Sequence, residues 1–141
     1  MATDSAHREA TVERVASGRF RAINGRGGQI TLGTGNGTDF TPAELLLVAI
    51  GGCTAIDVDV LTSRRAEPEA FQIVVEANKV RDAGGNHLTD IEVTYRIAFP
   101  PGGPGDEARA ILPDVVDRSR DRLCTVGRTV QLGTPVGTRI E

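Results

Sequence analysis

The sequence predicts an α+β fold in which antiparallel sheets are wrapped around a long central helix. The first observation is the order of elements, because pairs of short strands alternate with helices along the 141 residues. The second is a helical segment that is apolar on all sides over residues 45–56, as in a core helix. The third is a strand at residues 91–99 whose apolar residues alternate with polar ones, which predicts a half-buried sheet.

Each element follows from local sequence signals. A glycine-rich turn at residues 24–28 separates the first two strands. A second hairpin has its turn at residues 81–87, and a proline- and glycine-rich break at residues 100–105 precedes the second helix, which Pro113 should kink. The expected elements, in order, are strands 11–23 and 29–33, helix 42–65, strands 71–80 and 91–99, helix 106–122, and one or two strands at 126–132 and 136–140.

The start of the central helix is marked by a capping box. Thr41 is a favourable N-cap, Pro42 suits the first helical position, and Glu44 stands three residues after the cap. Further along, Gly51-Gly52 costs helix propensity. We therefore expect another backbone to pack closely against this pair, either from the same chain or from a partner subunit.

Composition limits the class of protein. The length favours one domain at residues 11–141 after a flexible N-terminus at residues 1–10. A net charge of −3 argues against nucleic-acid or anionic-membrane partners, which need a basic surface. No secretory signal pattern is visible, and the apolar stretch at residues 45–56 is too short to span a bilayer. We expect a cytoplasmic protein.

The two cysteines, Cys53 and Cys124, are the main candidates for chemistry. Each could be a small buried hydrophobe, since free cysteine is among the most buried residue types. However, one lies in the predicted central helix and the other directly after the second predicted helix. Two cysteines at such defined positions favour a redox pair. The histidines, His7 and His87, are not near either cysteine in the sequence, so we expect no metal site and no cofactor.

A redox pair would need a cation beside its nucleophile. A thiolate attacks a peroxide and becomes a sulfenic acid, which a second cysteine converts to a disulfide. Asp57 lies one helical turn from Cys53, where an unpaired carboxylate opposes thiolate formation. Either Asp57 pairs with an arginine for subunit packing, or it orients the arginine that activates Cys53. The candidates for that cation are Arg19, Arg21, Arg26 and Arg128.

The central segment PAELLLVAIGGCTAIDV, with a short LCTVG segment near the C-terminus, resembles the OsmC/Ohr family. The likeness covers residues 12–138 and is closest to the YhfA-like branch. It implies an OsmC-like fold in an intertwined homodimer, with two sites at the subunit interface. It also implies thiol-dependent reduction of organic hydroperoxides and a role in the oxidative stress response.

The resemblance also assigns roles to residues. It implies that Cys53 is the peroxidatic cysteine and Cys124 the resolving one, with an activating arginine in the first hairpin, for which Arg26 is our first choice. The peroxidase branches keep a glutamate where this chain has Ala43. Glu44 lies about two and a half turns from Cys53, on the opposite face of the helix, so Asp57 is the better candidate to hold the arginine.

Three functions follow from these residues. The first is a Cys-based peroxidase that acts on a small hydroperoxide and is recycled by a dithiol reductant. The second is a sensor or carrier of oxidants or electrophiles that uses the same thiols without efficient turnover, which Ala43 favours. The third is a small-ligand-binding dimer with core cysteines and a pocket lined by Leu46, Ile50 and Phe71.

Overall fold

The computed structural model describes residues 5–141, and the chain divides into two compact units, one up to Leu46 and one over residues 47–141. The fold is α+β, as the sequence predicts, with two antiparallel sheets and three α-helices in the described residues. Of the expected flexible N-terminus, residues 1–4 lie outside the described residues. Residues 5–9 have no regular structure.

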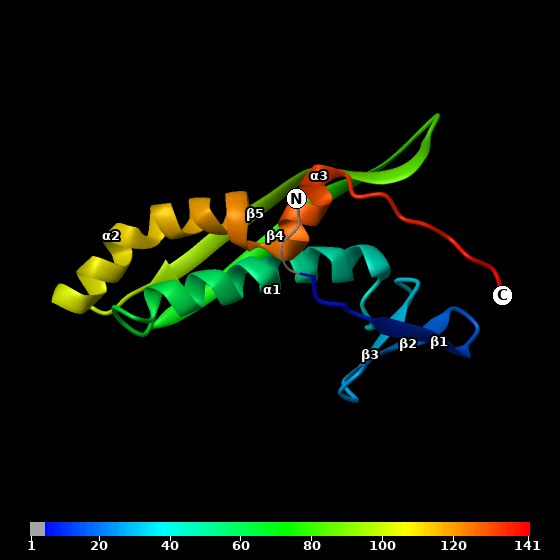
Figure 1. Ribbon diagram of the computed structural model, residues 1–141, viewed down its shortest axis with the longest axis horizontal. Coiled ribbons are helices and arrows are strands. Elements are labelled where there is room, and N and C mark those ends of the chain that lie inside the picture. The colour runs from blue at the N-terminus through cyan, green and yellow to red at the C-terminus, as the bar shows by residue number, and fades with distance from the viewer. Residues whose placement is uncertain (1–4) are drawn as a thin grey trace. The chain divides into compact units, whose positions relative to one another are not determined.

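The first unit is built on a three-stranded antiparallel sheet in the order β1-β2-β3 (Figure 1). Its strands are β1 Ala10–Ala16, β2 Arg19–Asn24 and β3 Gln29–Gly33. The single strand expected over residues 11–23 is wrong, because the chain reverses at Ser17-Gly18. Gly18 has φ +69°, a conformation that glycine adopts readily, and it allows this tight turn.

Helix α1, Pro42–Thr62, begins with the predicted capping box. The Thr41 amide donates to Glu44 Oε1 at 2.8 Å, and the Glu44 amide donates to Thr41 Oγ1 at 3.2 Å. The hydrogen bond from the Thr41 backbone amide, and after it the Thr41 hydroxyl, lower the pKa of the Glu44 carboxyl. By length and composition α1 could span a membrane, although the core helix of a soluble protein passes the same test.

The second unit packs helices onto a long hairpin. Strands β4 Ala70–Asp82 and β5 Gly85–Ala98 pair antiparallel, as predicted, with longer strands and a shorter turn. Helix α2, Gly103–Arg118, continues through Pro113. Arg109 of α2 donates to the Phe99 carbonyl just after β5 at 3.1 Å, and Figure 1 shows α1 and α2 running alongside the hairpin.

The end of the chain differs from the prediction. After α2 comes one π-helical turn, η1 Ser119–Leu123, and then helix α3, Thr125–Leu132. The strand expected at residues 126–132 is therefore wrong, and the second, at 136–140, is also wrong because residues 134–141 have no regular structure. Gly133 closes α3 in the left-handed conformation at φ 62°.

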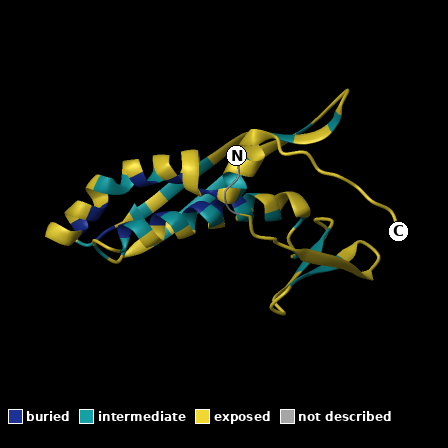
Figure 2. Ribbon diagram, viewed as in Figure 1, coloured by how far each residue is buried: buried dark blue, intermediate teal, exposed yellow. Residues whose placement is uncertain are grey.

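The core of the second unit lies where α1, α2 and the β4–β5 hairpin face one another (Figure 2). Its buried apolar residues are Ile50, Val58, Phe99, Ala108, Val115 and Cys124. The opposite face of α1 is uncovered, and its Val48, Ile56 and Val60 are 52%, 68% and 50% exposed. These residues recur every fourth position together with Gly52, so they form one apolar ridge along the helix.

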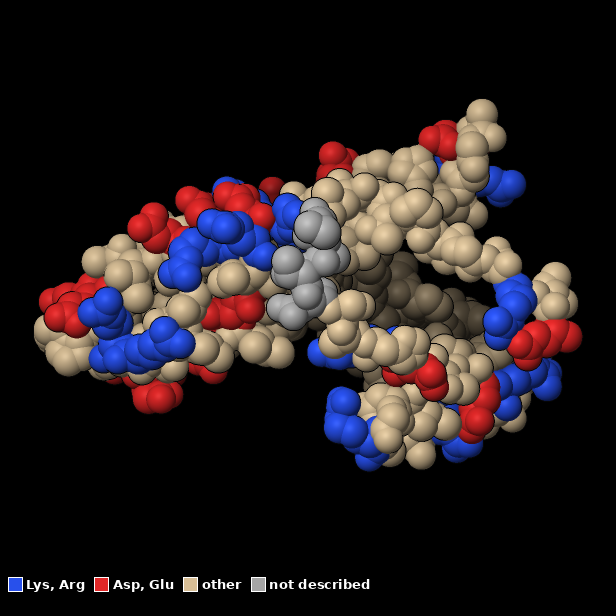
Figure 3. Space-filling view, in the orientation of Figure 1, with Lys and Arg blue, Asp and Glu red and all other residues tan. Residues whose placement is uncertain are grey.

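Acidic and basic side chains alternate over α2 instead of forming a patch of one sign (Figure 3). Arg109 pairs with Asp106 at 2.8 Å, and Arg120 pairs with Asp117 at 3.3 Å. Surface pairs of this kind contribute little to stability, about 0–1 kcal/mol each. On the face in view, α2 is thus a solvated surface that carries charges of both signs.

Close packing explains the first glycine of the Gly51-Gly52 pair. A Cβ at Gly51 would lie 2.8 Å from Val75 Cγ2 of β4. We expect Gly51→Ala to lower the free energy of unfolding by about 1–2 kcal/mol, because overpacking outweighs the gain in helix propensity. Urea denaturation measures this change.

The matched control makes room for the added methyl group. In a Val75→Ala background the same Gly51→Ala change should be neutral, or stabilising by up to about 1 kcal/mol. An equal loss in both backgrounds would rule out the contact with Val75 as its cause.

Candidate functional site

Three predicted site residues meet in the second unit. Cys53 and Asp57 stand one turn apart on α1, and Cys124 immediately precedes α3. The two sulfur atoms and a carboxylate oxygen of Asp57 all lie within 4.8 Å of one another. Cys124 is buried, whereas Cys53 and Asp57 are half-buried, and neither cysteine is in a disulfide. We call these three residues the thiol cluster.

Cys124 is held by backbone hydrogen bonds on both sides. Its amide donates to the Ser119 carbonyl at 2.8 Å, which closes the π-helical turn. Its Sγ caps α3 and accepts the Gly127 amide at 3.3 Å. A Cβ at Gly127 would lie 3.2 Å from that sulfur, so glycine lets the amide approach closely. The position of Cys124 is thus set by the junction between η1 and α3.

The surroundings of Cys124 keep it protonated. Burial is the largest effect that raises the pKa of its thiol, and a hydrogen bond with Cys53 and the charges of Cys53 and Asp57 raise it further. The Gly127 amide acts in the opposite direction. The Cys124 thiol therefore holds its proton more tightly than an exposed cysteine does.

A chain of hydrogen-bonded hydroxyl groups ends at the carboxylate of Asp57. Ser119 Oγ donates to Asp57 Oδ2 at 2.8 Å. Thr54 Oγ1 lies 2.7 Å from Ser119 Oγ and 2.7 Å from the Tyr95 hydroxyl. Since Ser119 gives its single proton to the carboxylate, Thr54 must donate to Ser119, and Tyr95 to Thr54. All three O–H groups are therefore directed toward Asp57, which fixes its orientation beside Cys53.

Replacing Thr54 with valine should break this chain. The change keeps the side-chain shape and deprives both Ser119 and Tyr95 of a partner, so we expect a loss of about 2 kcal/mol in unfolding free energy. Thr62→Val is the matched control, because Thr62 is equally buried on α1 and donates only to the Val58 carbonyl of its own helix. The control should cost under about 0.5 kcal/mol in urea denaturation, and equal losses would contradict the proposed chain of hydroxyl groups.

Four arginines are the candidate cations. Within residues 5–141, Arg19 pairs with Asp39 and Arg21 with Glu13, while the Arg26 side chain, in the turn after β2, has no such partner. Arg128 donates to the Asp121 carbonyl at 3.2 Å. In the same part of the chain the partner of Asp57 is Ser119, and Asp57 forms no ion pair with an arginine. The role of Arg26 stays a prediction.

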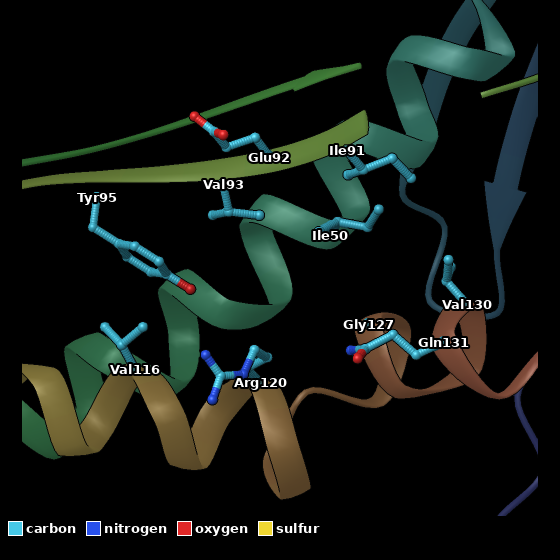
Figure 4. Close-up of a pocket in the computed structure, with 10 residues that line it drawn as sticks. All are labelled: Ile50, Ile91, Glu92, Val93, Tyr95, Val116, Arg120, Gly127, Val130 and Gln131. Atoms are coloured by element: carbon cyan, nitrogen blue, oxygen red, sulfur yellow. The ribbon is translucent and has the colours of Figure 1, made fainter. Parts of the chain in front are cut away.

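An apolar pocket of about 490 Å³ borders the cluster (Figure 4). Ile50, one turn before Cys53, lines it, and so does Gly127, whose amide contacts Cys124. Tyr95 and Arg120 point into the same space from β5 and from η1 (Figure 4). Of the pocket residues expected from the sequence, Ile50 lines this pocket, and Leu46 and Phe71 do not.

Several residues of the site were not predicted from the sequence. Thr54, Ser119 and Tyr95 come from three different elements and meet only after folding. Tyr95 gave a signal, since it is the only tyrosine of the chain and lies on the predicted apolar face of its strand. Neither Ser119 nor Gly127 has a local pattern that indicates a role beside a thiol.

Comparisons with known proteins agree on the family. The model of the family described as OsmC-like protein matches residues 34–139. An uncharacterized protein of Mycobacterium tuberculosis is 32% identical over 130 residues, which cover 92% of this chain and 93% of the relative.

Solved structures share the fold. A hypothetical protein from Aquifex aeolicus superposes with a TM-score of 0.73 at 23% identity, covering 92% of this chain and 91% of that one. The organic hydroperoxide resistance protein OhrB of Bacillus subtilis gives 0.54 at 14% identity, covering 88% and 90%. The family match covers the helix that carries Cys53 and also the second cysteine, so this chain belongs to the OsmC-like protein family.

Proposed function

We propose that this protein is a thiol-dependent hydroperoxide reductase that serves in the oxidative stress response. The observation that carries the proposal is the thiol cluster, because two cysteines far apart in sequence lie with their sulfur atoms within 4.8 Å. Membership of the OsmC-like family and the fold shared with a hydroperoxide resistance protein support it.

The reaction assigns different tasks to the two sulfur atoms. The Cys53 thiolate attacks one peroxide oxygen, the O–O bond breaks, and the alkoxide leaves and takes a proton to become an alcohol. Cys53 becomes a sulfenic acid. The Cys124 thiol then condenses with it to a disulfide and releases water. A dithiol reductant restores both thiols and is itself oxidised to a disulfide.

The pocket suits an apolar hydroperoxide. Half of its ten lining residues are aliphatic, and it reaches both Ile50 beside Cys53 and Gly127 beside Cys124. An alkyl or aryl group bound there would place its peroxide next to the thiols. In this proposal Arg26 supplies the cation that stabilises the Cys53 thiolate.

The proposed active form is a homodimer. The apolar ridge of α1, made by Val48, Gly52, Ile56 and Val60, is uncovered in the single chain. An apolar helix face of this kind is stabilised when a second copy covers it. Sedimentation equilibrium of the purified protein checks the dimer, and a monomer at micromolar concentration would contradict it.

A redox sensor is the second candidate. Ala43 replaces the glutamate of the peroxidase branches, and among the described residues Asp57 is held by Ser119 and not by a cation. Such a site would form its disulfide once and would be re-reduced slowly.

One experiment separates the two candidates. Reduced protein is treated with one equivalent of cumene hydroperoxide, and the disulfide is mapped by mass spectrometry. Hydroperoxide consumption is then followed with excess dithiol. A Cys53–Cys124 disulfide with many turnovers supports the peroxidase, and the same disulfide without turnover supports the sensor. No disulfide between these cysteines would exclude both.

A further inference from the structure

The thiol cluster has the composition of a metal site. Its three possible ligand atoms are two sulfurs and one carboxylate oxygen, all within 4.8 Å of one another. Zn²⁺ binds cysteine sulfur at about 2.3 Å and carboxylate oxygen at about 2.0–2.2 Å. A tetrahedral ion with these bond lengths needs ligand atoms about 3.5–3.8 Å apart. Since no two of the atoms are more than 4.8 Å apart, the cluster would have to contract by at most about 1.3 Å to bind such an ion.

The three ligands come from two different segments of the chain. Cys53 and Asp57 share one face of α1, one turn apart, and Cys124 comes from the junction of η1 with α3. A long helix fixes the first two relative to each other. The third comes from a separate segment of the same unit. This arrangement supplies three protein ligands and leaves the fourth position of a tetrahedral ion for water.

Outer hydrogen bonds already orient two of the ligands. Ser119 donates to Asp57 Oδ2 at 2.8 Å, which leaves the other carboxylate oxygen for an ion. Gly127 donates its amide to Cys124 Sγ at 3.3 Å, a contact that stabilises a thiolate. Such outer-shell donors typically hold metal ligands in position and tune their basicity.

The charges also favour a cation. Two thiolates and a carboxylate within 4.8 Å of one another would repel, so three anions at this place need a compensating positive charge. Asp57 has no arginine or lysine partner among the described residues of the second unit. A divalent ion would compensate two of the three negative charges.

We propose that Cys53, Asp57 and Cys124 form a binding site for a thiophilic divalent cation of the Zn²⁺ class, with water in the fourth position. Both sulfurs bind as thiolates, so binding releases to the solvent the protons that the thiols carry. The ion and the disulfide exclude each other because they use the same sulfur atoms. Metal binding would thus protect both cysteines from oxidation, and it does not depend on any reaction with hydroperoxides.

Cobalt titration tests the proposal. Co²⁺ is added to the reduced full-length protein without air, and sulfur-to-cobalt charge transfer in the near ultraviolet is recorded together with the visible bands of four-coordinate Co²⁺. We expect one ion per chain, displacement by Zn²⁺, and release of protons in weakly buffered solution near neutral pH. An absent charge-transfer band would overturn the proposal.

The variants test each ligand. Cys53→Ser and Cys124→Ser should each weaken Zn²⁺ binding by about 100-fold or more, and Asp57→Asn by about tenfold or more. Asp59→Asn is the matched control, because Asp59 is exposed on the same helix, and it should leave the affinity unchanged. Equal affinities for Asp57→Asn and the wild type would overturn the three-ligand site.

One measurement avoids substitutions altogether. Wild-type protein oxidised with diamide to the Cys53–Cys124 disulfide should lose Co²⁺ binding, and a dithiol followed by its removal should restore it. Retained binding after oxidation would place the ion elsewhere and overturn the proposal. Because this measurement contains no hydroperoxide, its outcome is independent of the proposed reductase activity.

Discussion

Replacing Cys53 with serine is expected to lower the rate of organic hydroperoxide reduction by about 100-fold or more. A serine hydroxyl is not ionised near neutral pH, whereas a thiolate is both ionised and strongly nucleophilic. Serine is close to cysteine in size, and Cys53 is only half-buried, so the fold should persist. The measurement is consumption of cumene hydroperoxide with excess dithiol, at matched protein concentration.

Cys124→Ser provides the comparison within the same site. Its Cys53 should still react with one equivalent of hydroperoxide, and the sulfenic acid should persist long enough to be trapped by dimedone and located by mass spectrometry. Cycling with a dithiol should slow because the resolving step is lost. If Cys124→Ser lost the first reaction while Cys53→Ser kept it, the two roles would be reversed.

Helix α1 is an element whose start and functional face can be predicted from the sequence. Thr41, Pro42 and Glu44 predict where it begins, and their hydrogen bonds are those of a capping box. The four-residue spacing of Cys53 and Asp57 predicts that they share a face, and the thiol cluster agrees. These predictions succeed because each depends on the geometry of a single helix.

The C-terminal segment shows where local signals fail. The β-branched residues of TVGRTVQL predict a strand, but strand propensity is weak and depends on context. The Cys124 cap at one end and Gly133 in the left-handed conformation at the other make it helical. Gly133 was a usable signal for a helix end, whereas a sulfur cap has no sequence pattern of its own.

The polar part of the site could not be predicted for a different reason. Tyr95, Thr54 and Ser119 lie on β5, α1 and η1, so their contact depends on how the three elements pack. The direction of the hydrogen bonds then follows from the single proton on Ser119. Only the tertiary structure brings these hydroxyl groups together, and with them the orientation of Asp57.

The largest expected effect on stability comes from Gly105, the third residue of α2. A Cβ there would lie 1.7 Å from the Pro100 carbonyl oxygen and 2.8 Å from its carbon. Both atoms are backbone, and the Arg109 bond to the Phe99 carbonyl ties the helix to the same segment, so neither side can yield locally. We expect Gly105→Ala to lower the unfolding free energy by about 3 kcal/mol or more. Thermal unfolding at fixed concentration should show a midpoint about 10 °C lower.

Gly103→Ala is the control for this substitution. Gly103 opens the same helix, and a Cβ there would meet no atom within 4 Å, so the change should be neutral or stabilising by a few tenths of a kcal/mol, about 0.5 at most. Because α2 leads directly into η1, a shift of the helix would also move Ser119 away from Asp57 and displace Cys124. Gly105→Ala should therefore lose hydroperoxide turnover and Co²⁺ binding together, even below its unfolding midpoint. If its unfolding midpoint matched that of Gly103→Ala, α2 would not pack on the Pro100 backbone in solution.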